Sequence, residues 1–506
     1  MTARTLMVQG TASSAGKSVM VAGLCRILRQ DGYRVAPFKS QNMSLNSFVT
    51  KDGGEMGRAQ VVQAEAAGVE PHVDMNPILL KPEMDQRSQV VLLGKPVFTT
   101  PAQEYYQHTP ALWKEARAAL ARLMAAYDVV IIEGAGSPAE INLRDREIVN
   151  MRVAREVGAP VLLVGDIDRG GVFAALVGTL VLLDDDERDA IKGFVINKFR
   201  GDIALLQPGL EMLEERTRKP VLGVIPYCHD IGIAQEDSIF EPAPHLQRVD
   251  VDIAVIYLPR ISNSTDFEPL QHEAGAQVRY IRNPGELGQP DLVIVPGTKS
   301  TMADLAHLRR TGLAAAVQRL AREGTPVIGI CGGFQILGRS IRDPHGVESQ
   351  SEEVEGLGLL PVDTVFDREK TTRQVAGRVV WGEGLLAGAK GLEVSGYEIH
   401  MGQTTDEGLA HPFQVQAGAD QLHDDGAVDA RGLVLGTYLH GLFQDQALRT
   451  VFLNNLRQRK GLSPQLPSVL PSREEYYDRL ANLVRQNLDM ARIYDICGLE
   501  PPRRRG

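Results

Sequence analysis

Two short runs of this 506-residue chain combine residue types that could do chemistry. They are Gly10-Thr11-Ala12-Ser13-Ser14-Ala15-Gly16-Lys17-Ser18 and Thr325-Pro326-Val327-Ile328-Gly329-Ile330-Cys331-Gly332-Gly333-Phe334-Gln335. The backbone N–H groups of a glycine loop that opens a helix bind phosphate oxygens, and a cysteine on a tight strand-to-helix turn is presented to a substrate. The sequence therefore predicts a phosphate site near the N-terminus and a nucleophile in the second half of the chain.

The predicted nucleophile, Cys331, needs a base, because a free thiol with a pKa near about 8.5 is mostly protonated at neutral pH. The best candidate is His440, and a buried structural cysteine and histidine are the alternative. Attack on a carbonyl creates an oxyanion, for which the N–H groups of Gly332 and Gly297 are candidate donors. The four cysteines of the chain form no CxxC pair, which argues against structural zinc and a disulfide framework.

In the phosphate loop, Gly10 and Gly16 are separated by five residues, one more than in the common P-loop pattern. Lys17 would neutralise the terminal phosphates of a nucleotide, and Ser18 would ligate Mg²⁺. Glu133 ends an apolar run at the carboxyl edge of a strand, where sheets of this kind bind ligands. A purely structural acidic residue is the alternative for Glu133.

Alternating apolar runs and helical patterns must position these residues, and the runs are apolar throughout, as in strands buried on both faces of a parallel sheet. In the first part they are Leu6 to Gln9, Val35 to Phe38, Val129 to Ile132, Val161 to Val164, Phe194 to Asn197 and Val221 to Ile225. A second series contains Val251 to Tyr257, Leu292 to Val295 and Val327 to Ile330. The predicted fold class is α/β, with two doubly wound parallel-sheet domains.

We expect domains at residues 1–240 and 250–448, joined by a linker from Gln235 to Arg248, and a helical extension at 449–506 packed on the second domain. The net charge of -10 gives no basic field that would gather nucleic acid. No apolar run approaches the roughly 20 residues of a membrane span, and the N-terminus lacks a signal peptide pattern. These features predict a cytoplasmic protein without nucleic-acid or membrane partners.

The longer phosphate loop resembles that of the dethiobiotin synthetase branch of P-loop proteins, which use ATP to activate carboxylates. This resemblance implies ATP as the nucleotide, Glu133 as a Mg²⁺ ligand, Glu55 as a second ligand, and Asn197 at the base-recognition position. A loop-capping role is the alternative for Asn197. The chain lacks the lysine that partition-type relatives carry between the two glycines, which weakens a cytoskeletal interpretation.

The run Gly329 to Gln335 resembles the nucleophile motif of triad-type glutamine amidotransferases, which hydrolyse glutamine to glutamate and ammonia. Those enzymes usually carry a glutamate two residues after the histidine, whereas this chain has Leu442. The departure resembles the branch that contains cobyric acid synthases and cobyrinate diamide synthases. Glu398 is a candidate for the group that orients His440.

The loops Pro37 to Ser47 and Glu133 to Asn150 resemble the cobyric acid synthase family, and the resemblance covers nearly the whole chain. It implies glutamine and a corrinoid as substrates: ATP would activate the four remaining amidatable carboxylates of adenosylcobyrinic acid a,c-diamide, and ammonia from Cys331 would convert them to amides. Lys39, Asn42 and Asp145 are candidates for substrate binding, with solvated loop residues as the alternative. Homo-oligomerisation is also compatible with the sequence.

Two other functions remain open at this point. A cobyrinic acid a,c-diamide synthase would perform the same chemistry on two other carboxylates, although the loop from Ser40 to Ser47 argues against it. A partition-type P-loop ATPase would dimerise on ATP, show no glutaminase activity and have no role for Cys331.

Overall fold

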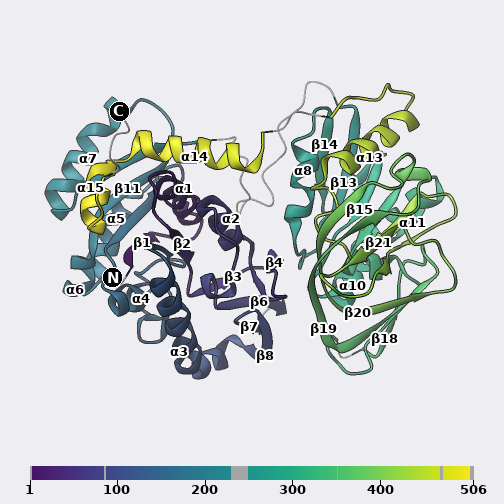
Figure 1. Cartoon of the computed structure of the whole chain (residues 1–506), viewed down its shortest axis with the longest axis horizontal. Coiled ribbons are helices and arrows are strands. Elements are labelled where there is room, and N and C mark those ends of the chain that lie inside the picture. Colours follow the sequence, from purple (N-terminus) through teal and green to yellow (C-terminus); the bar gives the residue numbers. More distant parts are fainter. Residues whose placement is uncertain (1–2, 85–86, 229–248, 350, 468–470, 502–506) are drawn as a thin grey trace.

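The computed structural model describes residues 3–84, 87–228, 249–349, 351–467 and 471–501. Figure 1 shows two lobes side by side, the first formed by the N-terminal half and the second by the segment that follows the linker. The predicted linker, Gln235 to Arg248, lies outside the described residues. None of the helices in the described ranges combines the length and hydropathy that a membrane span requires.

The first lobe is built on a six-stranded sheet whose neighbouring strands are all parallel. In spatial order the strands are β12 (Val221–Pro226), β11 (Ile191–Phe199), β10 (Val161–Asp166), β1 (Arg4–Gly10), β9 (Val129–Glu133) and β2 (Val35–Phe38). Its central strands are buried, because helices cover both faces of the sheet. All six predicted strands are therefore confirmed.

Several helices surround this sheet. They are α1 (Lys17–Gln30), α2 (Arg58–Ala67), α3 (Ala102–Ala126), α4 (Met151–Val157), α5 (Val172–Leu182), α6 (Asp185–Ala190) and α7 (Ile203–Thr217). β1 leads directly through the phosphate loop into α1, so the carboxyl edge of the sheet and the start of that helix face the same space.

Between β2 and α3 the chain forms two small sheets that the apolar pattern did not predict. One contains β3 (Gln41–Met43), β6 (Ile78–Met84), β7 (Arg87–Leu92) and β8 (Lys95–Pro101), and the other pairs β4 (Ser47–Val49) with β5 (Glu55–Gly57). β3, β4 and β5 have only three residues each, and β6, β7 and β8 mix apolar with polar residues, so none of them has the continuous apolar run of a buried strand. β4 contacts the second lobe and forms part of the interface between the lobes.

The second lobe repeats the parallel α/β plan in its core. Its main sheet has the order β14 (Ala276–Ile281), β13 (Val251–Ile256), β15 (Leu292–Val295), β16 (Val327–Ile330), β24 (Val434–Thr437) and β23 (Ala427–Val428), and only β23 runs antiparallel to its neighbour. Packed beside this sheet are α8 (Glu268–Gln271), α9 (Pro284–Leu287), α10 (Thr301–Thr311), α11 (Leu313–Arg322) and α12 (Gly332–Leu337). The predicted fold class is confirmed for both lobes.

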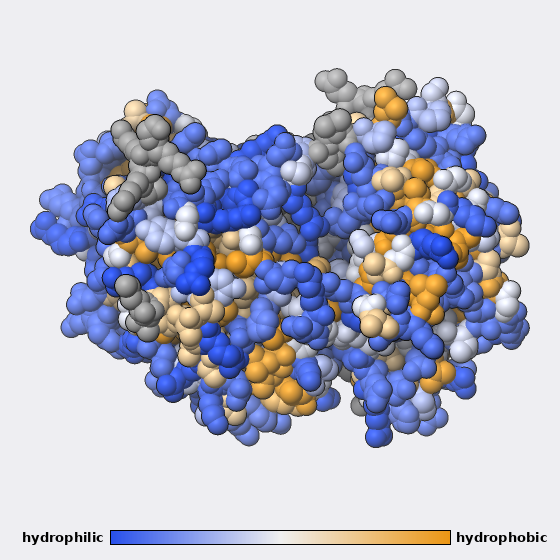
Figure 2. Space-filling view, in the orientation of Figure 1, coloured by the Kyte–Doolittle hydropathy of each residue, from blue (hydrophilic) through white to orange (hydrophobic). Residues whose placement is uncertain are grey.

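A further sheet of the second lobe, mostly antiparallel, was not predicted. It contains β18 (Glu353–Glu355), β17 (Ser340–Arg342), β19 (Val362–Val379), β21 (Phe413–Gln416) and β22 (His423–Asp425), with β20 (Glu393–Asp406) paired to β19. The long β19–β20 pair extends towards the first lobe, because both strands contact β4. Figure 2 shows hydrophilic residues over most of the visible face, with hydrophobic residues in smaller patches on both lobes.

The C-terminal extension is helical, as predicted. However, only part of it packs on the second lobe, where the sequence analysis placed all of it. α13 (Gln446–Arg459) packs on the second lobe, where Arg449 pairs with the buried Glu273 at 2.6 Å. α14 (Arg473–Asn487) and α15 (Met490–Cys497) instead pack on the first lobe, beside α1 (Figure 1). The amphipathic pattern of α14 marked an apolar face but did not identify the surface that it covers.

The packing of α14 on α1 predicts that a cavity in α14 will destabilise the first lobe. Leu480 is 2 % exposed and lies against α1, so Leu480→Ala should destabilise the first lobe by about 2–5 kcal/mol. Hydrogen exchange should accelerate in α1 and remain unchanged in α11. Leu205→Ala, at a side chain that is 84 % exposed, serves as the matched control. Faster exchange in α11 alone would contradict this packing.

Candidate active sites

Cys331 lies at the junction of β16 and α12, in the strained turn that the sequence predicts. Its φ of 50° is a conformation that non-glycine residues rarely adopt. Its N–H donates to the carbonyl of Thr437 at 2.8 Å, which ties the turn to the neighbouring strand β24. Gly333 permits the close approach of helix and strand, because a Cβ there would lie 1.9 Å from the Val295 carbonyl oxygen.

His440 follows β24, the strand beside β16, so parallel pairing brings the predicted base to Cys331. Its Nδ1 lies 2.7 Å from an Asp266 carboxylate oxygen, and the other oxygen accepts the Gly441 N–H at 3.0 Å. The Tyr397 ring stacks on the imidazole with a centroid distance of 5.3 Å. His440 also hydrogen-bonds with Cys331, so Cys331, His440 and Asp266 form a buried Cys-His-Asp triad.

The electrostatics of His440 favour its protonated form. Burial opposes the imidazolium, but the Asp266 carboxylate and hydrogen bonding with Cys331 outweigh it and raise the pKa of His440 to about 10. A protonated imidazole next to a thiol stabilises the thiolate, which is the nucleophilic form of cysteine. His440 is therefore an imidazolium beside Cys331 at neutral pH.

Glu398 does not orient His440, which corrects the sequence interpretation. Its carboxylate pairs with Arg373 and lies 3.3 Å from His423. Asp266 is the carboxylate that orients His440. It lies far away in sequence, on the short helix η3 (Ser264–Phe267) after β13. A sequence signal existed in the polar cluster Asn263-Ser264-Thr265-Asp266 after a strand, but nothing local connects it with His440.

The two predicted oxyanion donors lie beside the triad. Gly332 begins α12, where a Cβ would approach the Thr298 backbone nitrogen to 3.1 Å. A Cβ on Gly297 would lie 3.0 Å from Cε1 of His440. The structure thus brings both glycines to the catalytic pair, and their role as oxyanion donors stays a prediction.

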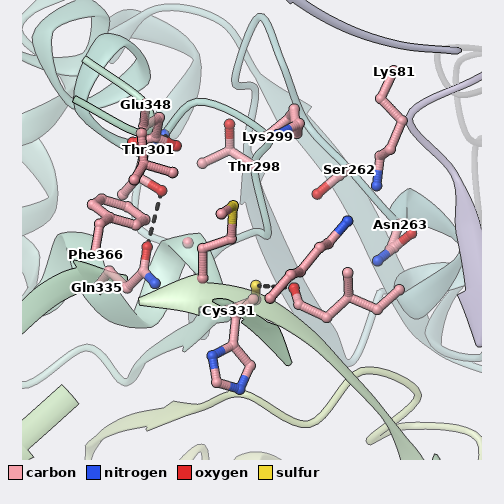
Figure 3. A pocket seen from close by; sticks show the side chains of 16 residues that line it. Lys81, Ser262, Asn263, Thr298, Lys299, Thr301, Cys331, Gln335, Glu348 and Phe366 are labelled. Atoms are coloured by element: carbon pink, nitrogen blue, oxygen red, sulfur yellow. Dashed lines mark hydrogen bonds between the residues drawn. The ribbon is translucent and has the colours of Figure 1, made fainter. Parts of the chain in front are cut away.

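A small pocket of about 60 Å³ opens at Cys331, and side chains from both lobes line it (Figure 3). Its lining includes Lys81 of β6 in the first lobe, together with Ser262, Asn263, Lys299 and Lys370 of the second lobe. The Cys331 thiol donates to the Ile399 carbonyl at 3.4 Å on one wall. The nucleophile therefore lies at the interface of the two lobes.

The phosphate loop follows β1 and ends at Gly16, whose φ of 97° suits glycine. A Cβ on Gly16 would also lie 2.0 Å from Nδ2 of Asn197, which donates to the Ala15 carbonyl at 2.9 Å. Lys17 donates to the carbonyls of Ala12 and Gly136 at 2.9 and 3.2 Å. Asn197 is thus packed on the loop, and its contact with a nucleotide base stays a prediction.

Glu133 is the centre of a buried network at the end of β9. The Ser18 hydroxyl donates to its carboxylate at 2.8 Å, and Lys39 pairs with it at 2.9 Å. Gln60 and Gln63 of α2 also donate to it, and sequence analysis missed both. Burial alone would raise the pKa of Glu133, but Lys39 and these hydrogen bonds lower it, so the group is an anion.

Mg²⁺ fits the donors present here. It binds through one or two protein oxygens together with phosphate oxygens and water, and the Ser18 and Glu133 oxygens are adjacent beside the phosphate loop. Glu55, the expected second ligand, is not brought to them in the structure. Its carboxylate is buried at the lobe interface, in ion pairs with Lys81 and Lys370.

The residues predicted to bind substrate have different environments. Lys39 and Asn42 are buried, where Lys39 pairs with Glu133 and Asn42 donates to Gln60 at 3.1 Å. Asp145 is exposed on the short helix η2 (Arg144–Arg146). The structure joins the first two to the network around Glu133, and substrate binding by all three stays a prediction.

A phosphate-binding α/β domain joined to a Cys-His-Asp domain defines the chain as a glutamine amidotransferase with a nucleotide-binding domain. Residues 6–239 match the CobQ/CobB/MinD/ParA nucleotide binding domain family, and residues 252–448 match the CobB/CobQ-like glutamine amidotransferase domain family. The chain is similar to a cobyric acid synthase of Dehalococcoides mccartyi (55 % identity, covering 98 % of this chain and 99 % of that one). It is also similar to that of Sorangium cellulosum (55 %, covering 99 % and 100 %).

The chain belongs to the cobyric acid synthase family. Among solved structures, PurLQS from Thermotoga maritima matches with a TM-score of 0.32 and 18 % identity, covering 41 % of this chain and 99 % of that one. The family assignment therefore depends on the full-length sequence relatives, which contain both domains.

Substitutions can distinguish the roles of the Asp266 and Glu398 carboxylates. Asp266→Asn should lower glutaminase activity by about 10²–10⁴-fold, because His440 loses its orienting partner. The same change lowers the pKa of His440, so the alkaline limb of the pH profile should move to lower pH, where the imidazolium is now lost. The measurement is glutamate release against pH.

Glu398→Gln is the matched control, because its carboxylate pairs with Arg373 and not with His440. It should change glutamate release less than about threefold and leave the alkaline limb in place. An equal loss in both variants would contradict the assignment of Asp266.

Proposed function

We propose that this chain catalyses the ATP- and glutamine-dependent amidation of carboxylate side chains of adenosylcobyrinic acid a,c-diamide to give adenosylcobyric acid, in the cytoplasm. The observation that carries the proposal is the full-length match to cobyric acid synthases, with both domains in the same chain. The triad and the phosphate loop supply the two chemical activities that such a reaction needs.

The first reaction activates the carboxylate, because oxide is a poor leaving group. A substrate carboxylate oxygen attacks the γ-phosphorus of ATP, and the bond to the ADP oxygen breaks, which leaves an acyl phosphate. Lys17 and the backbone N–H groups of the phosphate loop stabilise the charge on the transferred group. Ser18 and Glu133 would hold Mg²⁺, which neutralises phosphate charge when bound.

The second reaction releases ammonia. The Cys331 thiolate attacks the side-chain carbonyl carbon of glutamine, and the Gly332 N–H stabilises the resulting oxyanion. His440 donates its proton to the departing nitrogen, so ammonia leaves and a thioester remains. Water then cleaves the thioester to glutamate, with His440 as the base. Ammonia finally displaces phosphate from the acyl phosphate and forms the amide.

Contacts between the lobes support transfer of ammonia within the molecule. The Ser47 N–H of the first lobe donates to the Asn263 side chain at 2.9 Å, and Asn263 lies 3.4 Å from Nε2 of His440. Asn46 accepts the Ser264 N–H at 3.0 Å beside this contact. The first lobe thus reaches the residues that surround the catalytic base. Ammonia released here need not enter bulk water, where protonation would abolish its nucleophilicity.

The proposal predicts that the two activities can be separated by substitution. Cys331→Ser should lower glutamine-dependent amidation by about a thousandfold or more, because the nucleophile is lost, while amidation with added ammonium persists. Lys17→Ala should abolish both, because neither route proceeds without carboxylate activation. Mass spectrometry of corrinoid products and an assay of glutamate release measure these outcomes.

Cys228→Ser is the matched control, because Cys228 is a free cysteine outside the pocket lining and should behave like the wild type. Glutamine-dependent amidation that persists in Cys331→Ser would contradict the amidotransferase mechanism. ATP hydrolysis without glutamate release by the wild-type protein would instead favour the partition-type ATPase. Amidation of cobyrinic acid itself at two positions would favour the diamide synthase.

A further inference from the structure

Three buried charged side chains meet where the lobes join, beside the Cys331 pocket. Lys81 of β6 and Lys370 of β19 each approach the Glu55 carboxylate to 2.5 Å, one at each oxygen. The side chains of Lys81, Glu55 and Lys370 are 4 %, 1 % and 7 % exposed. Lys81 also donates to the Ser47 hydroxyl at 3.1 Å. We refer to Lys81, Glu55 and Lys370 as the lysine cluster.

The lysine cluster carries two ammonium groups and one carboxylate. Among the described residues, Glu55 is the only acidic side chain that pairs with either lysine. Burial lowers the pKa of Lys370 to about 8 against the effect of Glu55, so the Lys370 amine remains mostly charged at neutral pH. A buried excess of positive charge is unfavourable unless an anion neutralises it.

The amines face the pocket that contains the nucleophile, since both lysines line it together with Cys331. The other charged lining residues already have partners. Lys299 pairs with Glu83 at 2.9 Å, and Glu348 accepts the backbone N–H groups that begin α10. Figure 3 shows Lys81 and Glu348 on opposite sides of the pocket, with Cys331 between them. The excess positive charge therefore lies on the side of the lysine cluster.

We infer that Lys81 and Lys370 bind the α-carboxylate of the glutamine whose side-chain amide reaches Cys331. The inference rests on the proposed function, because it assumes that glutamine is the substrate of this pocket. A bound carboxylate gives two anions and two cations in the cluster, which removes the excess charge. Since Lys81 belongs to the first lobe, glutamine recognition then requires both lobes.

A carboxylate of the corrinoid has the same chemistry, but the pocket favours glutamine. Both lysines line the same pocket as Cys331, so the molecule that presents an amide to this thiol occupies the space that the two lysines face. The two sources differ in a measurable way. Glutamine recognition operates without any corrinoid present, whereas a corrinoid carboxylate affects only the amidation reaction.

The test compares L-glutamine with 4-aminobutanamide, which is glutamine without its α-carboxylate. Ammonia release is measured without corrinoid for the wild type, Lys81→Met and Lys370→Met. Each substitution should lower kcat/KM for glutamine by about 10–100-fold, mainly through KM, because one charged hydrogen bond is lost. The value for 4-aminobutanamide should stay within about threefold, so the preference for glutamine falls by about 10–100-fold.

A purely structural role of the lysine cluster predicts a different result. Equal losses for both amides, with an unchanged preference for glutamine, would overturn the inference. Either substitution leaves a neutral Lys–Glu pair, so no unpaired charge is buried. Lys370→Arg keeps the charge and should largely restore the preference. Lys460→Met is the control, because Lys460 pairs with Asp291 at the amino-terminal end of β15, whereas Cys331 follows the carboxyl end of β16.

An additional measurement needs no variant. L-glutamate should inhibit wild-type glutaminase at least about tenfold more strongly than 4-aminobutanoate, which lacks the α-carboxylate; equal inhibition would overturn the inference.

A raised KM for the corrinoid in ammonium-dependent amidation, with glutamine preference intact, would assign the lysine cluster to the corrinoid and overturn the inference too. Failure of the proposed function looks different, because the wild-type protein would then release no glutamate.

Discussion

Ammonia is a nucleophile only while it remains unprotonated, and this constraint explains why two chemically unrelated sites share one chain. At neutral pH bulk water converts ammonia to ammonium, so an enzyme that makes ammonia at one site and uses it at another gains by joining the sites. Cys331 and His440 accordingly lie at the interface of the lobes, where Lys81 of the first lobe lines the pocket. The backbone of Ser47 holds Asn263 against His440. The proposed glutaminase centre is thus in physical contact with the nucleotide-binding domain.

The interface itself is polar and charged, which is unusual for buried surface. The ion pair of Glu55 with Lys370 crosses between the lobes, as does the pair of Glu83 with Lys299, and Lys81 of the first lobe also pairs with Glu55. A small apolar contact of Phe48 with Tyr397 supports them, and Tyr397 in turn stacks on His440. Buried ion pairs add little net stability but demand one geometry, because a misplaced partner leaves a buried charge. Such an interface suits a protein in which the relative position of two sites matters more than the strength of their association.

The sequence predicted those features whose residues are adjacent in the chain. The phosphate loop with Lys17 and Ser18 and the elbow at Cys331 are local motifs, because a turn between a strand and a helix is determined by a few consecutive residues. The buried strands were predicted for the same reason, since each carries its own apolar run. Polar groups at the ends of neighbouring strands, such as Glu133 and His440, could be placed because parallel strands end at a common edge.

What the sequence determined by itself was the fold class and a set of candidate groups: a glycine loop with Lys17 and Ser18, a cysteine on a strand-to-helix turn, and a histidine after a strand. The tertiary structure decided which other side chains lie beside those groups. It placed Asp266 on His440 in place of Glu398, placed Glu55 at the lobe interface and not beside Ser18 and Glu133, and packed α14 on the first lobe. A carboxylate has the same residue type wherever it lies, and an apolar helix face fits many surfaces. Only the folded chain brings the distant partners together, so their pairing could not be predicted from local sequence.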